Sequence, residues 1–167
     1  MAFAKLKFPG MEAMISFRVF GKPIPQPRPR FARIGQFSRA YVPKSHPIHD
    51  FREAVRLGAM AAGVTPAAGL VEVSVVAMVE RPPSHFLKSG GLAKSAPAYP
   101  GRAIGDADNI AKGVLDALKG LAFADDAQAD LGFVRRRYGP QSFVDVWIVP
   151  VSEPKGEQCS SHPAGGN

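Results

Sequence analysis

Six aspartates gathered in one segment stand out in a chain that is otherwise basic. Residues 106–130 hold these six acids and two lysines, a net charge of −4, whereas the rest of the 167-residue chain has 19 bases and 8 acids, a net charge of +11. Crowding carboxylates together costs repulsion unless a cation binds among them. A divalent metal ion is the obvious candidate, because carboxylate oxygens are its preferred ligands. The basic remainder of the chain suggests that such a metal serves a polyanion.

Three of these aspartates are the candidate metal ligands. Asp106 and Asp108 lie at the start of a helix expected over residues 108–119, and Asp126 follows a short connection through Phe123. That connection could fold back and place Asp126, with its neighbour in the chain, beside the helix start. The segment contains no histidine, so its ligands suit Mg²⁺ or Mn²⁺ rather than zinc or copper. One or two such ions could bind a phosphodiester, generate hydroxide and stabilise the leaving oxygen.

The expected helix over residues 108–119 is amphipathic. At about 100° per residue, Asp108, Lys112 and Asp116 share one face with Lys119, and apolar residues fill the opposite face. Lys112 could contact the scissile phosphate or stabilise charge in the transition state. The alternative is a solvated face with an Asp108–Lys112 pair worth about 0.3–0.5 kcal/mol. Asp116 either supports the metal site or pairs with a lysine of this helix, and we favour the structural role.

Periodicity and turn residues predict an α+β fold, a single domain with a mixed sheet and two main helices. The stretch 70–79 is rich in valine and apolar on both faces, which is typical of a buried central strand. A hairpin joined by Gly139-Pro140 is expected for the last two strands. Residues 81–105 read as a long loop, of the kind that is usually functional or disordered. We expect strands over 15–20, 70–79, 128–138 and 142–149, and helices over 47–62 and 108–119.

The two ends of the chain differ from its middle. We expect an N-terminal extension over residues 1–13, the folded domain over 14–151, and a disordered tail over 152–167. The single cysteine, Cys159, falls in this tail, so no disulfide can form within the chain, which fits a reducing compartment. No apolar stretch approaches the roughly 20 residues that span a bilayer. The sequence therefore predicts a cytoplasmic protein without a membrane partner.

A proline-rich segment carries much of the positive charge. Prolines at every second position from Pro23 to Pro29 exclude a helix and predict an extended arm. Basic side chains can neutralise phosphates, and the interleaved Phe31, Phe37 and Tyr41 could stack on unpaired bases. The alternative is that Phe31 and Tyr41 pack on the core. The candidate DNA-binding residues are Lys22, Arg28, Arg30, Arg33, Arg39 and Lys44.

A run of three arginines, Arg135 to Arg137, falls on a predicted strand. Because side chains alternate along a strand, Arg135 and Arg137 share a face. These two arginines could either touch DNA or neutralise the aspartates, and the sequence favours neither role.

The acidic motif resembles that of a known family. Asp106-Ala-Asp108-Asn109, Lys112, Asp116-Ala-Leu118 and Asp125-Asp126-Ala-Gln128 together are similar to the RusA family of Holliday-junction resolvases, in its phage and prophage forms, over about residues 14–150. This resemblance implies a small homodimeric endonuclease that uses Mg²⁺, which Mn²⁺ could replace, to cut four-way DNA junctions in recombination and repair.

The resemblance also assigns roles to individual residues. It implies that Asp106, Asp108 and Asp126 bind the metal and that Lys112 is catalytic. One departure is Ala107, where leucine or isoleucine is common, and which should loosen packing between the first two aspartates. A homodimer also suits the substrate, because a four-way junction has two-fold symmetry and needs two symmetric nicks.

Two other functions fit parts of the pattern. A non-catalytic protein that binds junctions or single strands could use the same basic surface, but its binding would need neither metal nor aspartates. A metal-dependent nuclease of other branched-DNA specificity would differ only in the substrates that it cuts.

Overall fold

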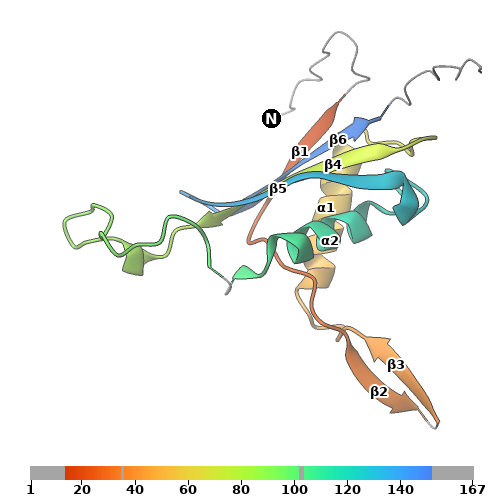
Figure 1. Ribbon diagram of the computed structural model, residues 1–167, viewed down its shortest axis with the longest axis horizontal. Helices are drawn as coiled ribbons and strands as arrows, with labels where there is room; N and C mark the ends of the chain where they lie inside the picture. The colour runs from red at the N-terminus through yellow and green to blue at the C-terminus, as the bar shows by residue number, and fades with distance from the viewer. Residues whose placement is uncertain (1–13, 35, 102–103, 152–167) are drawn as a thin grey trace, which may run out of the picture.

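The computed structural model describes residues 14–34, 36–101 and 104–151, and Figure 1 shows their arrangement. Two helices lie on one face of a four-stranded sheet, and a separate two-stranded hairpin extends away from it. The elements, in chain order, are β1 (Ile15–Phe20), β2 (Arg30–Ile34), β3 (Phe37–Tyr41), α1 (Ile48–Ala61), β4 (Val71–Glu80), α2 (Ala107–Leu118), β5 (Ala129–Gly139) and β6 (Phe143–Pro150).

The main sheet has the strand order β1-β6-β4-β5. Strand β6 runs antiparallel to both of its neighbours, whereas β5 runs parallel to β4. The predicted α+β class, with a mixed sheet and two main helices, is confirmed. The predicted hairpin between β5 and β6 is wrong, because β4 lies between them. Residues 71, 73, 75, 77 and 79 of the valine-rich β4 are buried on one face, and the strand takes a central position between β6 and β5.

The core lies between the sheet and the two helices. Alternate residues of β4, among them Val73 and Val75, are fully buried on the face that the helices cover. Helix α1 packs against α2 and β1, and α2 packs against β4 and β5. Ile48 from α1 and Ile110 from α2 are both fully buried in this layer. The apolar face predicted for α2 is thus confirmed, and each helix begins and ends within one residue of its expected bounds.

The proline-rich arm ends in a β-hairpin that the sequence did not reveal. Strands β2 and β3 pair antiparallel, with Arg30 opposite Tyr41 at the base and Arg33 opposite Ser38 nearer the tip. Among the described elements, each of these strands pairs only with the other, and Figure 1 shows the hairpin projecting away from the sheet and helices. The hairpin therefore stands apart from the core.

The connection from β4 to α2 is the long loop that the sequence predicted. Its described part contains a short 3-10 turn at Pro83–His85 and a bridge between Phe86 and Leu92, and otherwise neither helix nor strand longer than a few residues. Arg81 anchors its start by donating to the carbonyl of Pro97 at 3.0 Å.

No helix in the described ranges is long and apolar enough to cross a membrane. The predicted extension and tail, residues 1–13 and 152–167, lie outside the described residues.

Candidate functional site

The first turn of α2 presents two carboxylates to solvent. Asp106 is the N-cap residue in an extended conformation (φ −77°, ψ 152°), and Asp108 lies in the first turn; both are exposed. Within the described chain the Asp106 side chain makes no capping bond, so its carboxylate remains available to a ligand. The positive end of the helix dipole favours negative charge at this position.

Lys112 follows Asp108 by one helical turn and is also exposed. Among the described residues, Asp108 and Lys112 do not form an ion pair with each other. The alternative that these two side chains only pair with each other in solvent is therefore not supported. Two carboxylates and one ammonium group thus face solvent together at the start of α2. Carboxylates bind hard cations, and an ammonium group binds phosphate.

Asp126 lies at the opposite end of α2. Its Oδ2 accepts a hydrogen bond from Lys119 Nζ at 3.0 Å, and this bond raises the pKa of Lys119 above its ordinary value. Lys119 is the C-cap residue of α2, eleven residues after Asp108, which at a rise of 1.5 Å per residue is about 16 Å along the helix axis. The expectation that the connection folds back to the helix start is therefore wrong.

The sequence Asp125-Asp126-Ala-Gln128 forms a local capping motif. Asp125 Oδ1 accepts from the backbone N–H of Ala127 at 2.9 Å, and Gln128 Oε1 accepts from the backbone N–H of Asp125 at 3.1 Å. Together they make a capping box that satisfies the free donors at the start of a short 3-10 turn. Asp125 and Gln128 thus have structural roles, and the side chain of Asp126, 68% exposed, projects from the turn that they hold.

The structure thus brings together only part of the predicted metal site. Asp106 and Asp108 lie two residues apart at one end of α2, and Asp126 lies at the other end. In the part of the chain that the structure describes, no three His, Cys, Asp or Glu side chains gather into a group that could hold a metal ion. The chemistry of the pair at the helix start fits Mg²⁺ or Mn²⁺, which one or two carboxylates commonly hold together with water and substrate phosphate.

The basic arm is attached directly to the acidic end of α2. The backbone N–H of Gln26 donates to the carbonyl of Asn109 at 2.8 Å. Arg52 of α1 donates to Gln26 Oε1 at 2.7 Å and also forms an ion pair with Asp116. One arginine therefore joins the arm, α1 and α2. Asp116 was expected to pair with a lysine of α2, and its ion-pair partner is instead Arg52.

The residue before Asp106 is held by the arm and by the sheet. Gly105 has a φ of +88°, and a Cβ added to it would lie 2.4 Å from Pro25 Cβ, so no side chain fits there. The guanidinium of Arg136 donates to the carbonyl oxygens of Gly101, at 3.3 Å, and of Gly105. The backbone that leads into Asp106 is thereby fixed from two sides.

Arg136 is the residue of this site that sequence reasoning missed. Its neighbours in the arginine run occupy the other face of β5, where Arg135 lies over the ring of Phe133 and Arg137 over that of Tyr99. The alternation of side chains along a strand was the signal that could have identified Arg136, because it places the middle arginine on the face that carries α2.

The candidate DNA-binding residues all lie on the surface. Phe31 and Tyr41, at 71% and 43% exposure, do not pack on the core, so that alternative is wrong. Arg30, Arg33 and Arg39 belong to the hairpin, and the others belong to the segments that flank it. The exposed basic residues are Lys22, Arg28, Arg30, Arg33, Arg39 and Lys44.

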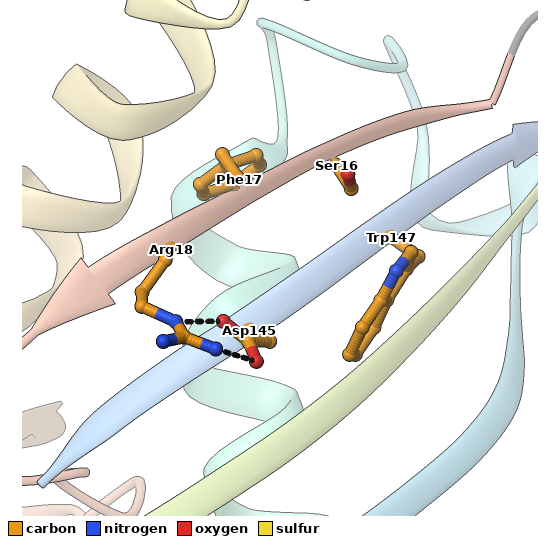
Figure 2. Close-up of a pocket in the computed structure, with 5 residues that line it drawn as sticks. All are labelled: Ser16, Phe17, Arg18, Asp145 and Trp147. Carbon is orange, nitrogen blue, oxygen red and sulfur yellow. Dashed lines mark hydrogen bonds and ion pairs between the residues drawn. The ribbon is translucent and has the colours of Figure 1, made fainter. Parts of the chain in front are cut away.

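A hollow on the other face of the sheet holds a bidentate ion pair, shown in Figure 2. Arg18 Nε and Nη2 donate to the two carboxylate oxygens of Asp145 at 2.6 and 2.8 Å, and the guanidinium lies 3.6 Å from the centre of the Phe143 ring. The hydrogen bond to Asp145 raises the pKa of Arg18. Both charges are paired and lie across the sheet from Asp106, so the hollow takes no part in the acidic site. Its lining consists of Ser16, Phe17, Arg18, Asp145 and Trp147.

Comparison with known protein families matches residues 21–148 to the family described as endodeoxyribonuclease RusA. A comparison with curated proteins found no match. The family match covers more than half of the chain and contains the basic arm, both helices, the acidic motif and Arg136. The chain therefore belongs to the RusA family of endodeoxyribonucleases.

Proposed function

We propose that this protein is a structure-specific DNA endonuclease that resolves four-way junctions by paired, symmetric phosphodiester hydrolysis, with Mg²⁺ as its cofactor. The observation that carries this proposal is the attachment of the arm to the acidic helix, through the bond between Gln26 and Asn109. DNA held by the arginines of the arm would lie close to Asp106 and Asp108. A metal at these carboxylates would then meet a phosphate that the same chain has bound.

Asp106, Asp108 and Asp126 would hold the metal ion, and Mn²⁺ could take the place of Mg²⁺. When bound, such an ion lowers the pKa of its water and stabilises charge on the phosphodiester oxygens. The chain itself supplies the other contributions. Lys112 would donate to the phosphate from the same helix face, while Arg136 and Pro25 keep the backbone before Asp106 in place.

The position of Asp126 supports a homodimer whose metal sites are shared between subunits. About 16 Å of helix separates Asp108 from the end of α2 where Asp126 is held, which is too far for one ion to bind both side chains in one chain. Two copies related by a two-fold axis, with their α2 helices antiparallel, would bring each Asp126 to the Asp106 and Asp108 of the other copy. The same axis would supply two sites for the two strands that must be nicked.

Cleavage of a synthetic four-way DNA junction, beside linear duplex of the same sequence, tests the proposal. The native chain and Asp108→Asn would each be assayed in Mg²⁺ and in EDTA, with binding measured separately by gel shift. We expect paired symmetric nicks in the junction only, abolished by EDTA and by the substitution while binding persists. Tight binding without cutting in Mg²⁺ or Mn²⁺ would instead indicate a non-catalytic DNA-binding protein. Flap and fork substrates are assayed in the same way, and cutting them as fast as the junction would indicate another branched-DNA specificity.

A further inference from the structure

The hairpin formed by β2 and β3 exposes aromatic rings that nothing in the described chain covers. Phe37, the first residue of β3 after the turn, is 80% exposed, and Phe31 is 71% exposed. Two-stranded hairpins without further packing are only marginally stable in water. A hairpin that keeps large rings exposed at its tip is therefore better suited to a bound partner than to the free protein.

The register places two aromatic residues and two arginines on one face of this ribbon. Residues opposite each other in an antiparallel pair share a face, so Arg30 and Tyr41 lie together, followed by Arg39 and then Phe37 at the tip. Phe31 and Arg33 lie on the other face. The first face thus alternates cation and ring, which is the combination that grips a phosphate backbone while stacking on bases.

The charge of the segment identifies the partner as a polyanion. No acidic residue occurs between Gly21 and His49, a stretch that contains six lysines and arginines. The hairpin of a second copy would bring the same positive charge to this hairpin and would be repelled. Nucleic acid is the occupant that complements the charge and also offers flat rings to Phe37.

We propose that the hairpin inserts Phe37 between bases at the branch point of a DNA junction and so distinguishes branched DNA from linear duplex. This inference rests on the proposed function, because it assumes that the chain binds branched DNA. Within a continuous duplex the bases are stacked, and separating them costs a few kcal/mol, but the cost is lower where stacking is already broken. Phe37 should therefore add affinity for the branch point and little for duplex, whereas Arg30 and Arg39 should add affinity for both.

The test uses a four-way junction that carries 2-aminopurine beside the crossover, since this base fluoresces more strongly when unstacked. The full chain would be titrated in EDTA, which prevents cleavage, and linear duplex would be titrated in parallel. We expect native protein to raise the fluorescence of the junction. Phe37→Ala should abolish that rise and weaken junction affinity by about tenfold, the equivalent of one lost stacking contact. Its affinity for duplex should stay unchanged.

Two further variants separate loss of the ring from loss of the hairpin. Phe37→Trp restores a stacking ring and should restore the fluorescence rise. Phe31→Ala removes a ring of similar exposure from the opposite face and should leave the rise intact. Because the hairpin lies outside the core, the melting temperature should be the same for all of these variants.

Three outcomes would overturn the inference. If Phe37→Ala binds and unstacks the junction like native protein, Phe37 does not insert between bases, and the proposed nuclease function stands. If light scattering shows that Phe37→Ala converts a dimer into a monomer, the occupant of the hairpin is a second copy. If native protein neither binds nor cuts junction or duplex, the proposed function itself fails, and the proposed insertion of Phe37 fails with it.

Discussion

Lys119 holds Asp126 at the C-terminal end of α2, with Nζ and Oδ2 3.0 Å apart, while Asp106 occupies the N-terminal end of the same helix. Both members of the pair are exposed, Lys119 at 45% and Asp126 at 68%, so solvent and salt screen the interaction. The bond therefore restrains Asp126 only weakly. The Asp126 carboxylate can therefore leave Lys119 and bind a divalent metal ion when one is brought close to it.

Asp126→Asn should remove activity without harming the fold. The side chain is exposed, and among the described residues it pairs with a surface lysine, so the melting temperature should change by less than about 2 °C. Junction cleavage in Mg²⁺ should be lost, because an amide oxygen is a poorer metal ligand than a carboxylate. Asp130→Asn, at another exposed aspartate a few residues on, is the matched control and should cut normally. Full activity in Asp126→Asn would remove this residue from the metal site.

Mixing two inactive variants should restore cleavage if the metal sites are shared between subunits. In a heterodimer of Asp106→Asn and Asp126→Asn, one site receives both defects and the other receives neither. We expect single nicks in the junction from the mixed protein and none from either variant alone, measured after subunits have been exchanged or co-expressed. If each site were built within one chain, every site in the mixture would carry one defect, and no nicks would form.

Gly105→Ala should destabilise the protein and also impair DNA cleavage. The left-handed conformation alone costs about 1–2 kcal/mol for a residue with a Cβ, and the approach to Pro25 adds overpacking of about 1–3 kcal/mol. Gly120→Ala is the matched control, because Gly120 has a φ of +78° but nothing within 4 Å of an added Cβ. Urea denaturation should show a larger loss for Gly105→Ala than for the control. Equal losses would mean that the contact with Pro25 is not tight.

Much of the fold follows from local pattern in the sequence. The valine-rich stretch that became β4 predicted a buried central strand, and β4 does lie between two other strands. The apolar face of α2, with Gly120 in a left-handed conformation just beyond its end, predicted that helix to within a residue. Strand pairing could not be obtained in the same way. Gly139-Pro140 suits a hairpin, but the pairing partner of β5 is decided by burial of β4, which is a non-local effect.

The candidate site was predictable in chemistry and less so in geometry. Residue types identified the carboxylates, the lysine and the basic arm correctly as exposed groups. The position of Asp126 depends on the capping box of Asp125 and Gln128, which sets the turn after α2. The proline run concealed the β2–β3 hairpin, because prolines disfavour pairing and the strands begin only after the last of them, Pro29.

Arg136→Gln should weaken metal binding more than DNA binding. The substitution removes the guanidinium that donates to the carbonyls of Gly101 and Gly105, and so loosens the backbone before Asp106. Loss of a group that supports a metal ligand typically lowers metal affinity by about 10- to 100-fold. Mn²⁺ affinity, measured by calorimetry, should fall in that range, while junction binding in EDTA stays constant. Arg135→Gln, on the opposite face of β5, should leave Mn²⁺ affinity unchanged; an equal fall in both variants would point to a general charge effect.

Replacing Arg28 and Arg30 together by alanine should weaken DNA binding and flatten its dependence on salt. Each phosphate contact releases counterions and contributes about −0.9 to the slope of log affinity against log salt, so losing two contacts should reduce that slope by about 1.8. Both arginines are exposed and flank Pro29 at the start of the hairpin, so replacing them should not disturb the core. Fluorescence anisotropy with linear duplex from 50 to about 300 mM salt measures the slope without cleavage when EDTA is present.

The matched control is Lys88→Ala with Lys94→Ala, which removes the same net charge from two exposed positions of the 81–105 loop. If the control flattens the slope equally, the arm is only one part of a diffuse basic surface. An effect confined to Arg28 and Arg30 would locate the phosphate contacts on the arm that Gln26 attaches to the acidic helix.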